Sequence, residues 1–310
     1  MLLVRHAVVA SLAISICASI DSTETVAVTE QDRDQEATRT LLDGSQEVVR
    51  TASTQADRFE TEHLILYVDK SLLSDDAARD FSRNLQRHFV ATSEYLQRRF
   101  DVVSRKTAKP EYYLTNRAGI SHVLGTRVFL NARRVIPSPA IAIHETVHLL
   151  LMTNPDAPRN RADNTPEEDA RLMATSGVWL AEGFAGYATG ELVSGLGIEP
   201  DRLFLKGDRT TIDAEAREWM RDPRGARVLP FVGAHGIPEG LLADRIDVAP
   251  PFYVLGYSFL KHLVEHAGLA TIVRLYEEHF DGTRSVEEDV KRITGKDLAE
   301  WREQWLAAIG

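Results

Sequence analysis

The chain of 310 residues is 44% hydrophobic and 26% charged, a balance typical of a folded protein that buries a sizeable core. Its formal net charge of −10, without a cluster of Lys and Arg, argues against a nucleic acid or an anionic membrane as partner. These numbers exclude a chain that is disordered throughout and leave the oligomeric state open.

The first twenty residues are arranged like a secretory signal peptide. Arg5 precedes an uncharged run over residues 7–20, and the sequence then turns polar. The run is shorter than the roughly 20 apolar residues of a membrane-spanning helix. We therefore expect cleavage at its end and a secreted or periplasmic protein without stable membrane insertion. An uncleaved N-terminal anchor and a lipoprotein modified at Cys17 are less favoured, the latter because Ile16 stands where such sites carry a small residue.

The rest of the chain divides into a polar segment and one domain. Residues 21–57 are rich in Thr, Ser, Gln, Glu and Asp and have little apolar periodicity, which predicts a disordered linker, or a propeptide. Residues 58–310 show no further shift in composition and form a single predicted domain. Cleavage after residue 20 would remove Cys17, the one cysteine. The mature chain would then have neither a disulfide nor a thiolate metal site.

The N-terminal part of this domain is predicted to contain a small sheet and a long helix. HLILYV (63–68) has the composition of a strand, and residues 74–100 have the period of an amphipathic helix that begins at Ser74. YYLT (112–115) and RVFLN (127–131) predict two more strands.

The remainder is helical in pattern. Pro137 and Pro139 mark the beginning of a helix that contains residues 142–151, and Gly268 and Gly295 mark helix ends. The clearest further helices are expected over residues 178–193, 257–266, 269–280, 285–293 and 296–309. A small sheet followed by a helical half predicts the α+β class.

The stretch AIHETVHLLL (142–151) carries the strongest functional signal. His144 and His148 are four residues apart, so a helix brings both imidazoles to one face, and Glu145 projects beside them. This is the spacing of the His-Glu-x-x-His motif, in which two His bind zinc and the Glu is the general base. The surrounding residues are apolar, so unpaired imidazoles and a carboxylate would be costly to bury. Histidines hydrogen-bonded within a core are the alternative.

A catalytic zinc needs a third protein ligand and an open position. WLAEGFAGY (179–187) offers Glu182 on a second apolar helix, where small neighbours let two helices approach closely enough for a short carboxylate to reach the metal. We expect Trp179 and Phe184 to anchor this helix.

HETVH followed by WLAEGFAGY resembles the gluzincin metallopeptidases, with the closer similarity to little-characterised exported bacterial gluzincin-like families. The resemblance implies a zincin-like fold, a small mixed sheet with a long helix before the active-site helix, and Zn²⁺ held by His144, His148 and Glu182. It also implies that Glu145 is the general base.

The segment YVLGYSFLKHLVEHAG resembles the Tyr-x-x-Gly segment of the aminopeptidase branch. That resemblance makes Tyr253 the expected donor to the oxyanion, with Tyr257 as its rival. His262 and His266 could also donate, although their helical surroundings favour a structural role.

Two departures limit the resemblance. Ala181 stands where thermolysin-like enzymes have Asn, and no Gly-Ala-Met-Glu-Asn segment precedes the active-site helix, so exopeptidase activity is unsupported. The family architecture implies a strand at the edge of the cleft that pairs with extended substrate. By its place in the order of predicted elements, RVFLN (127–131) is the strand best suited to this role.

We therefore predict an exported zinc metallopeptidase, a hydrolase that acts on peptide or protein substrates as an endopeptidase. Two alternatives remain: a catalytically inactive zincin-like binding domain of the cell envelope, and a zinc amidase that acts on cell-wall peptides. Retention of Glu145, which zinc binding does not need, weighs against the inactive domain.

Overall fold

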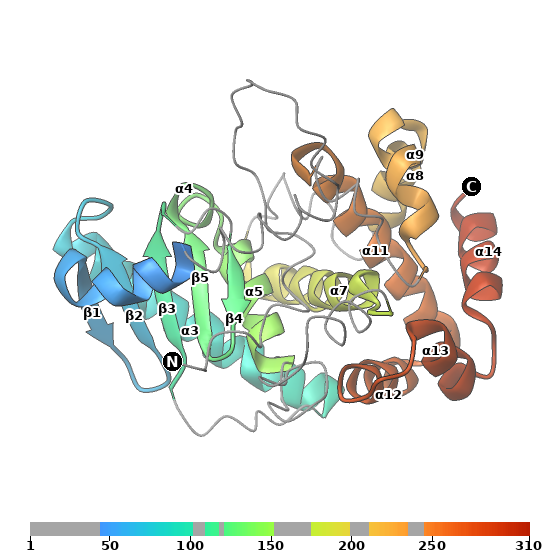
Figure 1. Cartoon of the computed structure of the whole chain (residues 1–310), viewed down its shortest axis with the longest axis horizontal. Helices are drawn as coiled ribbons and strands as arrows, with labels where there is room; N and C mark the ends of the chain where they lie inside the picture. Colours follow the sequence, from blue (N-terminus) through green and yellow to red (C-terminus); the bar gives the residue numbers. More distant parts are fainter. Residues whose placement is uncertain (1–43, 102–108, 118–120, 152–174, 199–210, 235–244) are drawn as a thin grey trace, which may run out of the picture.

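A computed structural model describes residues 44–101, 109–117, 121–151, 175–198, 211–234 and 245–310. A five-stranded mixed sheet lies at one side of the molecule and a group of helices at the other, with α5 and α7 running between them (Figure 1). The predicted α+β class is confirmed. The predicted signal peptide, residues 1–20, lies outside the described residues. Within the described ranges, every helix is too short or too polar to span a bilayer.

The sheet has the order β1-β2-β3-β5-β4. Its strands are β1 (Ala56–Glu60), β2 (Ile65–Asp69), β3 (Glu111–Thr115), β4 (His122–Leu124) and β5 (Arg127–Asn131). Strands β2, β3 and β5 are parallel, and β1 and β4 are antiparallel to their neighbours. The three parallel strands are the ones that the sequence predicted.

The expectation that RVFLN forms the edge strand is wrong. This strand, β5, pairs with β3 on one side and with β4 on the other. The physical reason is a tight hairpin: Gly125 adopts a φ of 61°, a left-handed conformation that glycine tolerates, and folds β4 back along β5. The edge of the described sheet on this side is therefore β4.

One face of the sheet is covered by two helices, α3 (Asp75–Phe100) and α5 (Pro139–Leu151), with the short α4 (Ala132–Val135) between β5 and α5. Helix α3 begins where predicted, because the Ser74 side chain accepts a hydrogen bond from the Ala77 N–H. Pro139 occupies the first turn of α5, where its missing N–H costs nothing.

The opposite face is covered by a helix over residues 44–55. Its Val48 and Ala52 are buried against Tyr113 and Phe129. The prediction of a polar linker is therefore wrong for residues 44–57, where the helix and the beginning of β1 belong to the domain. From within the helix, this contact is made by Val48 and Ala52, one helical turn apart, and by the partly buried Val49. These are too few residues for a recognisable period.

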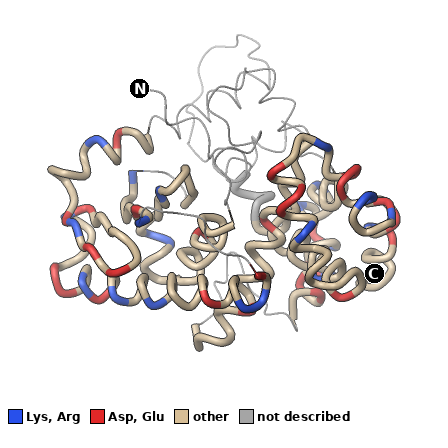
Figure 2. Tube along the Cα trace, turned by 90° about the horizontal axis from the view of Figure 1, so that it is seen from below, with Lys and Arg blue, Asp and Glu red and all other residues tan. Residues whose placement is uncertain are grey.

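The predicted C-terminal helices are confirmed. They are α7 (Val178–Leu196), α11 (Arg245–Ala267), α12 (Leu269–Phe280), α13 (Val286–Thr294) and α14 (Leu298–Ile309), with α8 (Ile212–Arg221), α9 (Pro223–Val228) and a 3-10 turn (Leu229–Phe231) before α11. Helix α11 begins earlier than predicted and contains Pro250 and Pro251. Figure 2 shows Lys and Arg interspersed with Asp and Glu along the outer helices.

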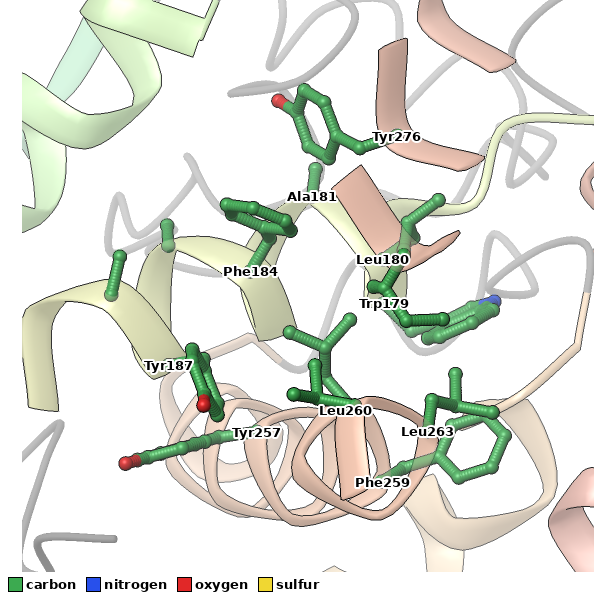
Figure 3. Packing of buried hydrophobic residues seen from close by; sticks show 14 of the residues in the cluster. Trp179, Leu180, Ala181, Phe184, Tyr187, Tyr257, Phe259, Leu260, Leu263 and Tyr276 are labelled. Atoms are coloured by element: carbon green, nitrogen blue, oxygen red, sulfur yellow. The ribbon is translucent and has the colours of Figure 1, made fainter. Parts of the chain in front are cut away.

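The second and larger core lies between α5, α7, α11 and α12. Figure 3 shows aromatic side chains of α7 meeting those of α11, with Tyr276 of α12 beside Phe184. As expected, Trp179 and Phe184 anchor α7: their ring centroids lie 5.0 Å from those of Phe259 and Phe100 respectively. This core fixes α7 beside α5, where the chemistry-bearing residues are.

Candidate metal centre

Helix α5 is buried from Ala140 to Leu151, and its polar residues lie among apolar ones. Ile143 and Val147 are 0% exposed, and the neighbouring His148 is 2% exposed. His144 and Glu145 retain 8% and 7% exposure, so this turn of the helix still borders solvent among the described residues. Burial of three polar side chains in one apolar helix requires that they be paired or ligated.

Helix α7 brings Glu182 to both histidines. The Nε2 atoms of His144 and His148 are 3.1 Å apart, and Oε2 of Glu182 lies 3.1 Å from the first and 3.4 Å from the second. Glu182 itself is 0% exposed. The three predicted ligands are therefore brought together, from segments 34 residues apart in sequence.

The spacing of these donor atoms fits a metal ion. Ligands at about 2.0–2.1 Å from a tetrahedral ion lie about 3.3 Å from one another, close to the three distances found. Two imidazole nitrogens and a carboxylate oxygen, all of them lone-pair donors, converge on one point. Within the described chain, this is the group of His, Asp and Glu side chains whose ligand atoms meet closely enough to hold an ion.

Charge and burial shift the pKa values of the group. Burial, together with the proximity of His148, lowers the pKa of His144. Burial alone would raise the pKa of Glu182, but the two histidines hold it below its usual range. Burial likewise works to lower the pKa of His148, and the Glu182 carboxylate outweighs it and raises that pKa. The shifts of Glu182 and His144 favour the forms that a cation needs, a carboxylate and an imidazole with a lone pair, whereas His148 has to lose its proton before a cation can bind there.

Glu145 lies beside this group on α5 without belonging to it. Burial, and secondarily the charge of Glu182, raise the pKa of Glu145 to about 8, although His148 opposes the shift. A bound cation would also oppose it. A carboxylate in this environment is more basic than one in water, which suits a group that accepts a proton.

Of the two candidate tyrosines, Tyr253 lies at the site. Its ring meets the His144 ring edge to face, with centroids 5.7 Å apart. Tyr257 lies one turn further along α11, packed against Tyr187 and against Gly186 and Gly190 of α7. The structure therefore separates the two residues that the sequence left as rivals.

The two other histidines of α11 lie elsewhere. His262 and His266 are adjacent, with ring centroids 4.1 Å apart, and His262 faces Trp301 of α14. These contacts agree with the structural role that their helical surroundings favoured.

Nδ1 of His148 is buried without a hydrogen-bond partner among the described residues. A different polar network was not predicted: His279 and Asp289, both 0% exposed, are hydrogen-bonded to each other at 3.1 Å near the beginning of α7. The sequence indicates this pair by a polar residue at a core position of α12 and another at a core position of α13. In α12, His279 shares one face with the apolar Ile272, Leu275 and Tyr276.

A comparison of the chain with protein-family models finds no match, and a comparison with curated proteins finds none either. The assignment of a function therefore depends on the site.

Proposed function

We propose that this chain is an exported zinc metallopeptidase with a zincin-like fold, related to the gluzincins and acting as an endopeptidase. The observation that carries the proposal is the triangle formed by His144, His148 and Glu182, whose donor atoms are 3.1–3.4 Å apart. Two imidazoles and one carboxylate are the ligand set of known zinc peptidases and leave a fourth position open. The predicted signal peptide supports export.

The residues around the triangle fit hydrolysis. A zinc ion in this position would polarise a substrate carbonyl and lower the pKa of a water molecule. Glu145 takes the proton from the attacking water at its carboxylate and returns it to the amine that leaves. The burial of Glu145 supports this role because it raises the pKa of the carboxyl.

Tyr253 would donate its hydroxyl hydrogen to the oxygen that becomes negatively charged as water adds to the carbonyl. Its position beside His144 supports this role. A preorganised donor contributes about 10²–10³-fold in rate when measured by its removal.

The substrate is a peptide or protein that binds in extended conformation beside the sheet. Strand β4 lies next to β5 in the described sheet and contacts α5, the helix that carries both histidines. Main-chain pairing with a strand binds many sequences, with side-chain pockets supplying selectivity.

The test is metal content together with cleavage of a peptide mixture by the mature chain. We expect one zinc per chain, and we expect Glu145→Gln to keep the zinc and lose at least about 10³-fold in kcat/KM, since it removes the base but no ligand. A Gln variant that cleaves as fast as wild type would refute the mechanism. Zinc without cleavage of any peptide would identify a binding domain, and cleavage confined to cell-wall peptides would identify an amidase.

A further inference from the structure

A network of three side chains, two of them buried, lies on the C-terminal helices beside the beginning of α7. His279 lies in the last turn of α12 and Asp289 lies in α13. A hydrogen bond of 3.1 Å joins Nδ1 of His279 to Oδ2 of Asp289. Arg292 donates to the other oxygen of Asp289 at 2.7 Å. The histidine and the aspartate are both 0% exposed.

Nε2 of His279, the ring nitrogen that does not contact Asp289, points at α7. The backbone N–H of Gly177 donates to Nε2 of His279 at 3.2 Å, so Nε2 carries the lone pair and the hydrogen sits on Nδ1, where Asp289 accepts it. Asp289 thereby fixes both the tautomer and the ring orientation of His279. Gly177 is the residue from which α7 begins, and its carbonyl accepts the first two hydrogen bonds of that helix, from Leu180 and Ala181.

The hairpin of α12 and α13 holds α7 on both sides of Glu182. Before Glu182, His279 binds Gly177, and the Val286 N–H donates to the carbonyl of Thr175 at 3.2 Å. After Glu182, the ring of Tyr276 packs against Phe184 with centroids 5.0 Å apart. A helix is stiff over this length of less than two turns, so these contacts set where the Glu182 carboxylate stands.

The backbone at Gly177 has little room to move if its hydrogen bond to His279 is lost. A Cβ on Gly177 would lie 2.7 Å from Cγ2 of Val286, which means that the chain entering α7 is already in close contact with α13. A peptide N–H at a helix start that loses its acceptor must find another or distort the first turn. The first turn is the one that leads directly to Glu182.

We propose that His279, oriented by Asp289, is a positioning residue for Glu182: it fixes the beginning of α7 and thereby the place of the carboxylate in the metal centre. The inference rests on the proposed function, because it assigns Glu182 to a bound ion. It couples the metal centre to helices that carry none of its ligands.

The experiment compares four full-length mature proteins, each loaded with zinc or with cobalt(II). They are the wild type, His279→Leu, His279→Gln and Thr294→Val. Leu removes the acceptor for Gly177, whereas Gln can keep an oxygen near the place of Nε2. Thr294→Val is the matched control, because it removes the acceptor of the Trp301 indole N–H, 2.9 Å away, on the same helix as Asp289 but away from α7.

The readouts are the zinc affinity, from competition with a chelator at a temperature where circular dichroism shows every protein folded, and the visible absorption spectrum of bound cobalt, which reports ligand geometry. We expect His279→Leu to bind zinc about tenfold more weakly, the lower end of the range for groups that orient metal ligands, with a changed cobalt spectrum. His279→Gln should restore most of both, and Thr294→Val should match the wild type.

One result would overturn this inference but not the proposed function: His279→Leu keeps the wild-type zinc affinity and cobalt spectrum, while Glu182→Gln loses the metal. A wild type that binds no zinc would overturn the proposed function and this inference with it. If His279→Leu does not fold, Asp289→Asn replaces it, and an unchanged cobalt spectrum in that variant would also overturn the inference.

Discussion

Gly183 of α7 faces Gly256 of α11 with no space for a side chain on Gly183. A Cβ on Gly183 would lie 2.7 Å from the carbonyl oxygen of Gly256, so the two helices touch through their backbones. Glu182 precedes the first glycine, and Tyr253 lies three residues before the second. This contact therefore sets how far the Glu182 carboxylate of α7 stands from Tyr253 of α11.

Gly183→Ala should separate the two helices. The added methyl group would meet backbone atoms, which cannot rotate away. We therefore expect a loss of about 1–3 kcal/mol in the free energy of unfolding, and a loss of kcat/KM that remains when the assay is run where the variant is folded. Gly195→Ala is the control, because this glycine of the same helix has no atom within 4 Å of the added Cβ. It should be neutral or stabilise by up to about 1 kcal/mol. Equal effects of the two substitutions would contradict the account.

Glu182→Gln should remove the metal without unfolding the chain. The neutral amide is a weaker ligand, so we expect the zinc content to fall and the chelator to lose its effect on the melting temperature. In the wild type, zinc at 100 times its Kd should stabilise the folded state by about 2.7 kcal/mol, and a chelator should reverse this. Glu94→Gln, on the exposed face of α3, should behave as wild type in both measurements.

His262 makes stability depend on pH. Burial and the proximity of His266 lower the pKa of His262 from 6.5 to about 4, so the unfolded chain binds this proton at higher pH than the folded chain does. The free energy of unfolding should therefore be undiminished above pH 6.5, fall as the pH drops from 6.5 to 4, and lose up to about 3 kcal/mol on this account.

Chemical denaturation at a series of pH values checks this dependence. His262→Phe, which keeps a ring against Trp301, should flatten the slope between pH 6.5 and 4. His63→Gln should leave the slope unchanged, since the His63 side chain is 40% exposed. A His262→Phe protein with the wild-type slope would show that another group is responsible.

Val48→Asp tests whether the helix over residues 44–55 belongs to the domain. Val48 is 2% exposed against the sheet, so an uncompensated charge there should cost about 3–5 kcal/mol. Ser53→Asp lies on the exposed side of the same helix and should have little effect. Thermal unfolding distinguishes the two variants. A Val48→Asp protein as stable as Ser53→Asp would show that residues 44–55 do not pack against the sheet and act as a linker.

The sequence predicts those parts of the site that follow from local periodicity. His144 and His148 share a helix face, and Glu182 stands alone among apolar and small residues, so both helices and the three ligands could be predicted. The pairing of Gly183 with Gly256 could not, because the contact joins two helices far apart in sequence. Tyr253 and Tyr257 could not be separated for the same reason.

The remaining misses come from short or polar elements. Strand β4 has three residues, too few for a period, and its position at the edge depends on the turn at Gly125. His279 and Asp289 were overlooked although each occupies a core position of its helix. A buried polar residue at such a position indicates a network, and a second such residue on the next helix indicates its partner.

Anomalous X-ray diffraction from a zinc-loaded crystal tests the central claim most directly. We expect one peak between α5 and α7, with Nε2 of both histidines at about 2.0–2.1 Å and a Glu182 oxygen at about 2.0–2.2 Å from the ion. A peak bound to other residues, or a Glu182 carboxylate turned away from an ion that the two histidines hold without it, would contradict the claim.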